Sequence, residues 1–178
     1  MGIIVTVFGS AKPAEGEKEY REAYEVGYVL GKAGFVVCNG GYGGTMEASA
    51  RGAKEAGGKT IGVTAEIFAR HANPWIDQEI RMKSLVERLM KLIELGSAYI
   101  VLRGGTGTLL ELAAVWEFIT KRLIAEKPII TIGTFWDDVV RTVKTQLLRE
   151  GLEDAATSIV RAASPSECLR LLQSRLGQ

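Results

Sequence analysis

The chain has 178 residues and carries 22 Lys and Arg against 21 Asp and Glu, a formal net charge of +1. A chain of this length can form one core of ordinary size, so we expect a single domain over residues 1–178. A balanced charge creates no general field for a nucleic-acid backbone or an anionic membrane, so neither is expected as a partner and any anion must be bound locally.

Targeting and redox features favour an intracellular protein. The start MGIIVTVFGS lacks the charged and apolar regions of a signal peptide. Cys38 is expected in a buried strand and Cys168 in a C-terminal helix, a placement that does not suggest a disulfide framework. The apolar runs are strand-sized rather than long enough to cross a membrane. We therefore expect a cytoplasmic location.

Short β-branched runs alternate along the chain with longer segments of helical period, the pattern of parallel strands joined by crossover helices. In chain order the expected elements are strand Ile3–Phe8, helix Glu17–Ala33, strand Phe35–Cys38, helix Thr45–Ala56, strand Thr60–Val63, helix Glu79–Leu95, strand Ala98–Leu102, helix Thr108–Arg122, strand Ile129–Ile132, helix Trp136–Arg149, strand Ser158–Arg161 and helix Pro165–Leu176. Several strands are apolar at consecutive positions, as expected when helices cover both faces of a sheet. The pattern predicts a doubly wound, Rossmann-like α/β fold.

Four glycines, Gly34, Gly57, Gly96 and Gly151, stand where these helices should end. Glycine adopts the left-handed conformation that commonly follows a helix without steric penalty. The least regular stretch is Thr64–Asp77, which follows the C-terminal end of an expected strand. Open α/β sheets bind their ligands at that edge.

Two glycine-rich turns each follow an expected strand and open a helix: Asn39–Glu47, with the sequence NGGYGGTME, and Arg103–Glu111, with the sequence RGGTGTLLE. A backbone without Cβ atoms can approach a phosphate closely, and the first turn of a helix offers free N–H groups. A weaker third turn is Gly9–Ala11. Neither dinucleotide GxGxxG spacing nor GxxxxGK[ST] is present, so nicotinamide cofactors and P-loop chemistry are disfavoured and no cofactor is expected.

Two charged residues near the second turn have structural and functional interpretations. The spacing of Thr108 and Glu111 fits a capping box, in which Glu111 would only receive a backbone N–H. Arg88 shares a predicted helix with Glu87, Lys91 and Glu94 and could be a solvated surface charge. The residues alone do not decide between these interpretations and a role in a binding site.

The segment from Arg88 to Glu111 resembles the Lonely Guy (LOG) family, whose hallmark is an Arg ahead of a P-G-G-x-G-T-x-x-E motif. Arg88 falls at the Arg position, and the motif is matched at Gly104, Gly105, Gly107, Thr108 and Glu111. The resemblance extends over residues 3–150. It has two departures: Arg103 stands where the family usually has Pro, and the turn GGYGGTME is shorter and differently spaced than the family's first loop.

The resemblance implies a function and a site. Family members of known activity hydrolyse N6-modified adenosine 5′-monophosphates to the free base and ribose 5-phosphate, so we expect AMP or an N6-modified AMP as substrate. The expected catalytic residues are Glu111, which would stabilise the developing positive charge on the ribose or activate water, and Arg88, which would orient the substrate. The expected substrate-binding residues are Ser10, Gly43, Gly44, Thr45, Gly104, Gly105, Thr106, Gly107 and Thr108.

Other features complete these expectations. Tyr42, Phe68 or Trp75 could hold a purine or simply pack in the protein. His71 is the only histidine, and no metal site is expected. The resemblance implies a homodimer, for which the apolar face of Leu109, Leu112, Ala113 and Trp116 could serve unless it faces the sheet. The alternative function is a non-catalytic binding or carrier protein for a nucleotide or for the molybdenum cofactor.

Overall fold

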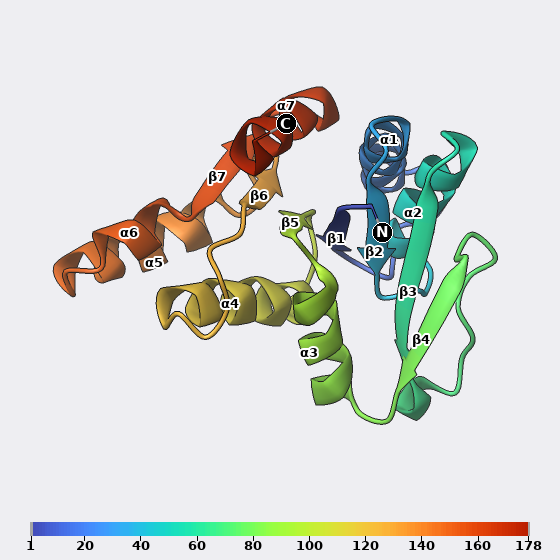
Figure 1. Cartoon of the computed structure of the whole chain (residues 1–178), viewed down its shortest axis with the longest axis horizontal. Coiled ribbons are helices and arrows are strands. Elements are labelled where there is room, and N and C mark those ends of the chain that lie inside the picture. The colour runs from blue at the N-terminus through green and yellow to red at the C-terminus, as the bar shows by residue number, and fades with distance from the viewer. Residues whose placement is uncertain (1, 178) are drawn as a thin grey trace.

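The computed structural model describes residues 2–177, so Met1 and Gln178, the ends of the predicted domain, lie outside the described residues. These residues form one parallel sheet of seven strands in the order β4-β3-β2-β1-β5-β6-β7 (Figure 1). The strands are β1 (Ile4–Phe8), β2 (Val36–Asn39), β3 (Lys59–Ala65), β4 (Gln78–Met82), β5 (Ala98–Val101), β6 (Ile129–Ile132) and β7 (Ile159–Ala162). The helices are α1 (Lys18–Lys32), α2 (Thr45–Glu55), the 3₁₀ turn Glu66–Phe68, α3 (Leu85–Leu95), α4 (Thr106–Thr120), α5 (Asp137–Arg149), α6 (Glu153–Thr157) and α7 (Pro165–Leu176).

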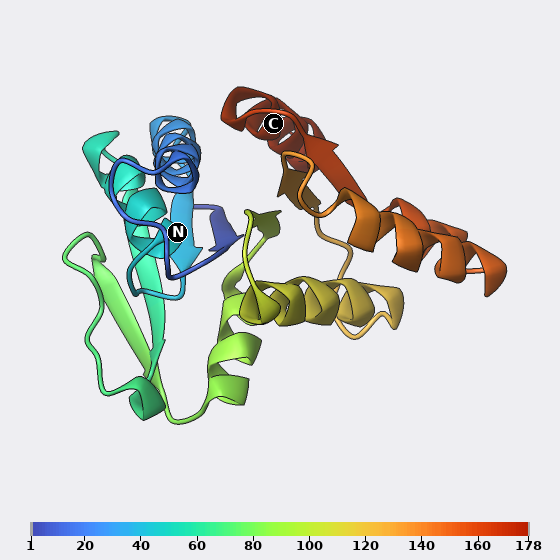
Figure 2. The ribbon, with the colours of Figure 1, turned by 180° about the vertical axis from the view of Figure 1, so that it is seen from behind.

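Helices cover both faces of the sheet, as the continuous apolar strands predict. One core joins the sheet to α1, α2 and α7, and the other joins it to α3, α4 and α5. Figures 1 and 2 show α1 and α2 side by side on one side of the sheet, with α3 and α4 on the other. Burial of apolar surface on both faces explains why the strands carry few solvent-facing polar residues.

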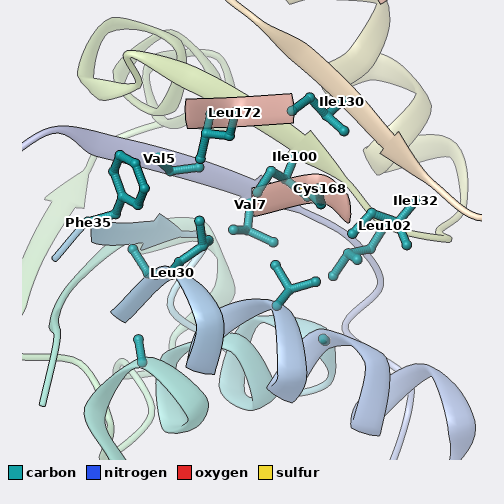
Figure 3. Packing of buried hydrophobic residues seen from close by; sticks show 14 of the residues in the cluster. Val5, Val7, Leu30, Phe35, Ile100, Leu102, Ile130, Ile132, Cys168 and Leu172 are labelled. Carbon is teal, nitrogen blue, oxygen red and sulfur yellow. The ribbon is translucent and has the colours of Figure 1, made fainter. Parts of the chain in front are cut away.

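Side chains of a strand alternate between the two cores. Val5, Val7, Ile100 and Leu102 contact the core beneath α1 and α7, which Figure 3 shows together with Leu30, Cys168 and Leu172. The next positions along the same strands, including Phe8, Tyr99 and Val101, point into the opposite core. Cys38 and Cys168 are both buried and free, in the strand and the helix predicted for them.

One expected helix is wrong in its first half. Gln78–Met82 belongs to strand β4 rather than to a helix that begins at Glu79, and α3 begins only at Leu85. This strand lies at the edge of the sheet, pairs with β3 alone and remains largely exposed. Its polar side chains are compatible with an exposed helix as well as with an edge strand, so the pairing with β3 decided its structure. The structure also adds the short helix α6, which the sequence pattern did not predict.

Glycine ends three of the four helices as expected. Gly34, Gly57 and Gly151 take positive φ angles of 83°, 81° and 73°. Gly96 does not, because its φ of −67° and ψ of 129° are extended. A Cβ atom at Gly96 would lie 2.7 Å from the Thr6 hydroxyl oxygen, so space rather than the backbone angle favours glycine there.

The strand order reverses direction at β1 and β5. From β1 the chain adds β2, β3 and β4 on one side, and β5, β6 and β7 follow on the other. At such a switch point the loops after the two central strands diverge and leave a crevice at the C-terminal edge of the sheet. No helix within residues 2–177 is both long and apolar enough to span a bilayer.

Candidate functional site

A hollow of about 430 Å³ opens at the C-terminal edge of the sheet, at the crevice between β1 and β5. Its walls come from the loops that follow β1, β2, β3 and β5 and from helices α2, α3 and α4. The lining residues are Gly9, Ser10, Ala11, Lys12, Tyr42, Met46, Phe68, Arg70, Leu85, Arg88, Gly105, Thr106, Gly107, Thr108 and Glu111. The fold therefore brings together Arg88, Glu111, Ser10 and most of the second glycine-rich turn.

The N-terminus of α4 faces this hollow. The helix begins at Thr106 after Gly105, and the N–H of Leu109 is the first to reach a carbonyl of the turn, that of Gly105 at 2.9 Å. The N–H groups of Thr106, Gly107 and Thr108 precede it and have no acceptor within the helix. Unpaired N–H groups at the positive end of a helix dipole form an anion site. Gly104 lies just outside the lining, packed against the Thr108 side chain.

Glu111 does not cap this helix. Thr108 is the third residue of α4 rather than the residue before it, and α4 has no side-chain cap at its N-terminus. The capping-box interpretation is therefore wrong, because a Thr inside the helix cannot act as its N-cap. Glu111 lies in the second turn, with its side chain on the wall of the hollow.

Arg88 is buried against the sheet instead of lying in solvent. Its Nε donates to the Val63 carbonyl at 2.7 Å, and its Cζ lies 5.6 Å from the centre of the Tyr42 ring. A Cβ atom at Gly40 would overlap Nη2 of Arg88, so the guanidinium occupies space that only glycine leaves open. The surface-charge interpretation is wrong, since only 10% of this side chain is exposed.

Arg88 and Glu111 form a buried pair without a direct hydrogen bond. Nη1 of Arg88 lies 3.9 Å from Oε1 of Glu111, beyond hydrogen-bond length. Burial raises the pKa of Glu111 to about 7, although the neighbouring Arg88 favours the charged carboxylate. Burial also lowers the pKa of Arg88. Both groups thus retain unused hydrogen-bonding capacity at the wall of the hollow, and Glu111 can exchange a proton near neutral pH.

The first glycine-rich turn has a different arrangement from the second. Both the N–H and the hydroxyl of Thr45 donate to the Ser10 carbonyl, at 2.9 and 3.1 Å, so the loop after β1 covers the start of α2. Gly44 packs against the backbone of Ser10 and Ala11. Of the expected binding residues, Gly43, Gly44 and Thr45 therefore do not line the hollow, whereas Tyr42 and Met46 on either side of them do.

Two of the three candidate aromatic residues lie at the hollow. Tyr42 is buried, its hydroxyl exchanges hydrogen bonds with the backbone of Ala65, and its ring meets that of Phe68 edge-on at 5.5 Å. The Phe68 ring is 42% exposed and available to a ligand. Trp75 lies elsewhere, beneath the guanidinium of Arg51 at 5.4 Å from its ring centre.

Lys12 and Arg70 also line the hollow, although neither was among the residues predicted for the site. Their positions in the sequence could have indicated both residues. Lys12 follows the third glycine turn, and Arg70 lies in the irregular stretch that follows β3. Among residues 2–177, neither Lys12 nor Arg70 forms an ion pair with a carboxylate. With Arg88, the hollow has three cationic side chains and one carboxylate, so it favours an anionic ligand.

Arg103, the departure from the family motif, turns away from the hollow. Its guanidinium lies 4.8 Å from the centre of the Phe135 ring and 3.5 Å from a Glu19 carboxylate oxygen, and 59% of the side chain is exposed. It neither blocks the hollow nor contributes to its lining. The Arg at the Pro position of the motif therefore leaves the phosphate-type turn open.

The apolar face of α4 is divided between the core and the surface. Leu112 and Trp116 are buried, whereas Leu109 is 39% exposed. Together with Val139 and Val143 of α5 they line a shallow apolar groove of about 240 Å³. The homodimer expected through this face stays a prediction. Among residues 2–177 no cluster of three or more possible metal ligands occurs, and His71 lies exposed before β4.

The model of the SLOG cluster4 family matches residues 2–169. The chain belongs to this family. The LOG resemblance is thereby confirmed, and the match extends over nearly the whole chain.

Two proteins of related sequence and one solved structure are similar to this chain. An uncharacterized protein of Archaeoglobus fulgidus is 35% identical over 65% of this chain and 76% of its own length. A cytokinin riboside 5′-monophosphate phosphoribohydrolase of Mycobacterium tuberculosis is 34% identical, and the match covers 63% of this chain and 61% of that protein. The structure of the molybdenum cofactor binding protein from Rippkaea orientalis has a TM-score of 0.77 and 26% identity, over 99% of this chain and 98% of that chain.

Proposed function

We propose that this protein hydrolyses the N-glycosidic bond of a nucleoside 5′-monophosphate, such as AMP or an N6-modified AMP, to the free base and ribose 5-phosphate. The observation that carries the proposal is the buried pair of Arg88 and Glu111 beside the open N-terminus of α4. One hollow thus contains an anion site and a carboxylate with a perturbed pKa. A strongly perturbed titratable group in a cleft is typical of a catalytic site.

The phosphate would bind at the N-terminus of α4. The backbone N–H groups of Thr106, Gly107 and Thr108 supply donors, and Lys12 and Ser10 stand on the facing loop. The N–H groups are fixed by the helix, and the backbone of the loop that carries Ser10 and Lys12 is held by its bonds to Thr45. A preformed site of this kind loses little entropy when the ligand binds.

The ribose would then lie next to Arg88 and Glu111. Cleavage of the C1′–N bond leaves positive charge on the sugar, which the Glu111 carboxylate stabilises. Water adds its hydroxyl to C1′, the electrons of the broken bond go to the base, and Glu111 accepts the proton that the water loses. The proton that Glu111 takes from the water is then released, directly or through solvent, to the departing base, so atoms and charges balance and Glu111 is restored. Arg88 favours the ionised form of Glu111 and donates to the sugar hydroxyls.

The test is release of free base from AMP and from N6-isopentenyl-AMP by the purified chain. We expect multiple turnovers by the wild type and a fall in kcat of about 10² to 10⁴ in Glu111→Gln. Glu117→Gln is the matched control, because Glu117 lies on the same helix but is 56% exposed and pairs with Lys121. No release by the wild type, or unchanged release by Glu111→Gln, contradicts the proposal.

A second candidate is a carrier that binds its ligand without turnover. It is favoured by the likeness to the molybdenum cofactor binding protein over nearly the whole chain. In that case the same hollow would hold a phosphorylated pterin, with its phosphate at α4. Saturable binding of such a ligand together with no release from any nucleotide would favour the carrier over the hydrolase.

A further inference from the structure

The hollow has a defined order of chemical groups from one end to the other. In the sheet, the strands that supply its loops are ordered β3, β2, β1 and β5. Neighbouring strands lie about 4.8 Å apart, so the end at β3 and the end at β5 are separated by about 14 Å. The anion site of α4 lies at the β5 end, and Phe68 and Arg70 follow β3 at the other.

A nucleotide whose phosphate binds α4 therefore places its base toward Phe68 and Arg70. Arg88 and Glu111 come from α3 and α4 and provide the polar groups between the two ends. At the base end the Phe68 and Tyr42 rings meet edge-on, and Leu85 and Met46 also line the hollow, so apolar surface is available to a flat heterocycle. Arg70 is the charged side chain at this end of the hollow.

The hydrogen-bonding character of this end is one-sided. A guanidinium has five N–H donors and no acceptor. The Tyr42 hydroxyl already exchanges hydrogen bonds with Ala65, and the single carboxylate of the lining, Glu111, lies beside Arg88. This end of the hollow thus provides donors for acceptor atoms on the base and no carboxylate for an exocyclic amino group.

We infer that the hollow selects a heterocycle with a lactam oxygen, such as the 6-oxopurine of IMP or GMP, over the 6-aminopurine of AMP, through donation from Arg70. Arginine pairs in a bidentate manner with the O6 and N7 acceptors of guanine, whereas adenine presents an amino donor at position 6. This inference rests on the proposed placement of the phosphate at α4. It departs from the N6-modified adenine expected from the family resemblance.

The inference does not depend on catalysis, so binding tests it separately. IMP and AMP are matched ligands, because they differ at position 6 of the purine and the adjoining N1 proton. Dissociation constants would be measured by calorimetry on the Glu111→Gln chain, where hydrolysis is suppressed, and checked by thermal stabilisation of the wild type. We expect IMP to bind about tenfold more tightly than AMP, within the range for one bidentate arginine contact.

Variants at Arg70 identify the residue responsible. Arg70→Ala and Arg70→Lys should both bring the ratio of the IMP and AMP affinities close to one. Because Lys keeps the positive charge but cannot form the bidentate contact, Arg70→Lys tests whether the contact or the charge is responsible. Arg70 is exposed, so these changes leave the fold intact. Arg170→Ala is the control, because Arg170 is also exposed but lies on α7, which contributes no residue to the hollow.

The outcomes separate this inference from the proposed hydrolysis. Equal or tighter binding of AMP, no binding of either nucleotide, or a ratio that survives in Arg70→Ala overturns the inference. Preferential binding of IMP with no release of hypoxanthine supports the inference and contradicts the hydrolase. Equal binding and equal release from AMP and IMP contradict the inference and support the hydrolase.

Discussion

The buried carboxylate of Glu111 should cost the protein stability, and Glu111→Gln should recover it. Burial raises the pKa of Glu111 from 4.5 to about 7, and the exposed fraction of its side chain is only 14%. A shift of this size corresponds to about 3 kcal/mol of differential interaction between the two protonation states. A neutral Gln of similar size lacks the charged form altogether, so it avoids this cost.

The size of this cost depends on pH. Below about pH 4.5 the carboxyl is protonated in both the folded and the unfolded chain, and it costs nothing. Between 4.5 and 7 the unfolded chain ionises while the folded protein keeps its proton, so stability falls as pH rises. Above about pH 7 the full cost is present. The benefit of Glu111→Gln should therefore be larger by roughly 2 to 3 kcal/mol at pH 8 than at pH 5.

Urea unfolding at the two pH values measures this difference directly. Comparing the variant with the wild type at each pH cancels the pH-independent consequences of the substitution, including the altered contact with Arg88. Glu117→Gln removes the same charge from an exposed position of α4 and should show less than about 0.5 kcal/mol of change between the two pH values. A Glu111→Gln benefit that is the same at pH 5 and pH 8 refutes the burial argument.

Three further predictions concern activity. The kcat/KM for base release should rise with pH to a plateau, with a midpoint near 7, because the reaction uses ionised Glu111. Arg88→Ala should move that midpoint upward, since Arg88 favours the charged form. A profile that is flat from pH 5 to 8 contradicts the assignment. Gly40→Ala should lower kcat/KM about 100-fold with an unchanged circular dichroism spectrum, because its Cβ displaces the Arg88 guanidinium; full activity shows that Arg88 need not occupy this position. Arg103→Ala should change kcat/KM by less than about threefold, as expected for an exposed pair outside the hollow; a large loss would place Arg103 at the ligand.

The sequence predicted the architecture because local patterns and the global fold agree. Strand Ile129–Ile132 and helix Pro165–Leu176 have the predicted bounds, and the apolar strands required helices on both faces. The edge strand β4 was missed because its exposed, polar residues have no apolar pattern of their own. Its structure depends on backbone pairing with β3. The local propensity of its own residues does not indicate that pairing.

The candidate site shows the same division between local and tertiary information. The motif around Gly105 to Glu111 placed a phosphate-type turn at the start of a helix, and the structure places that turn at the crevice. The motif could not show that Thr45 would donate its hydrogen bonds to the Ser10 carbonyl. It also could not show that the Arg103 guanidinium would lie over the Phe135 ring. These outcomes depend on neighbouring loops that are remote in the sequence.

The sequence by itself determined the alternation of strands and helices, the two glycine-rich turns and the residue types available for chemistry. The tertiary structure decided which of those residues meet. Arg88 is buried because Gly40 leaves room for its guanidinium and Val63 offers an acceptor, and Glu111 is a candidate acid or base because α3 and α4 enclose it there. Burial and the distance between charges set a pKa, and both arise only when segments distant in the chain pack together.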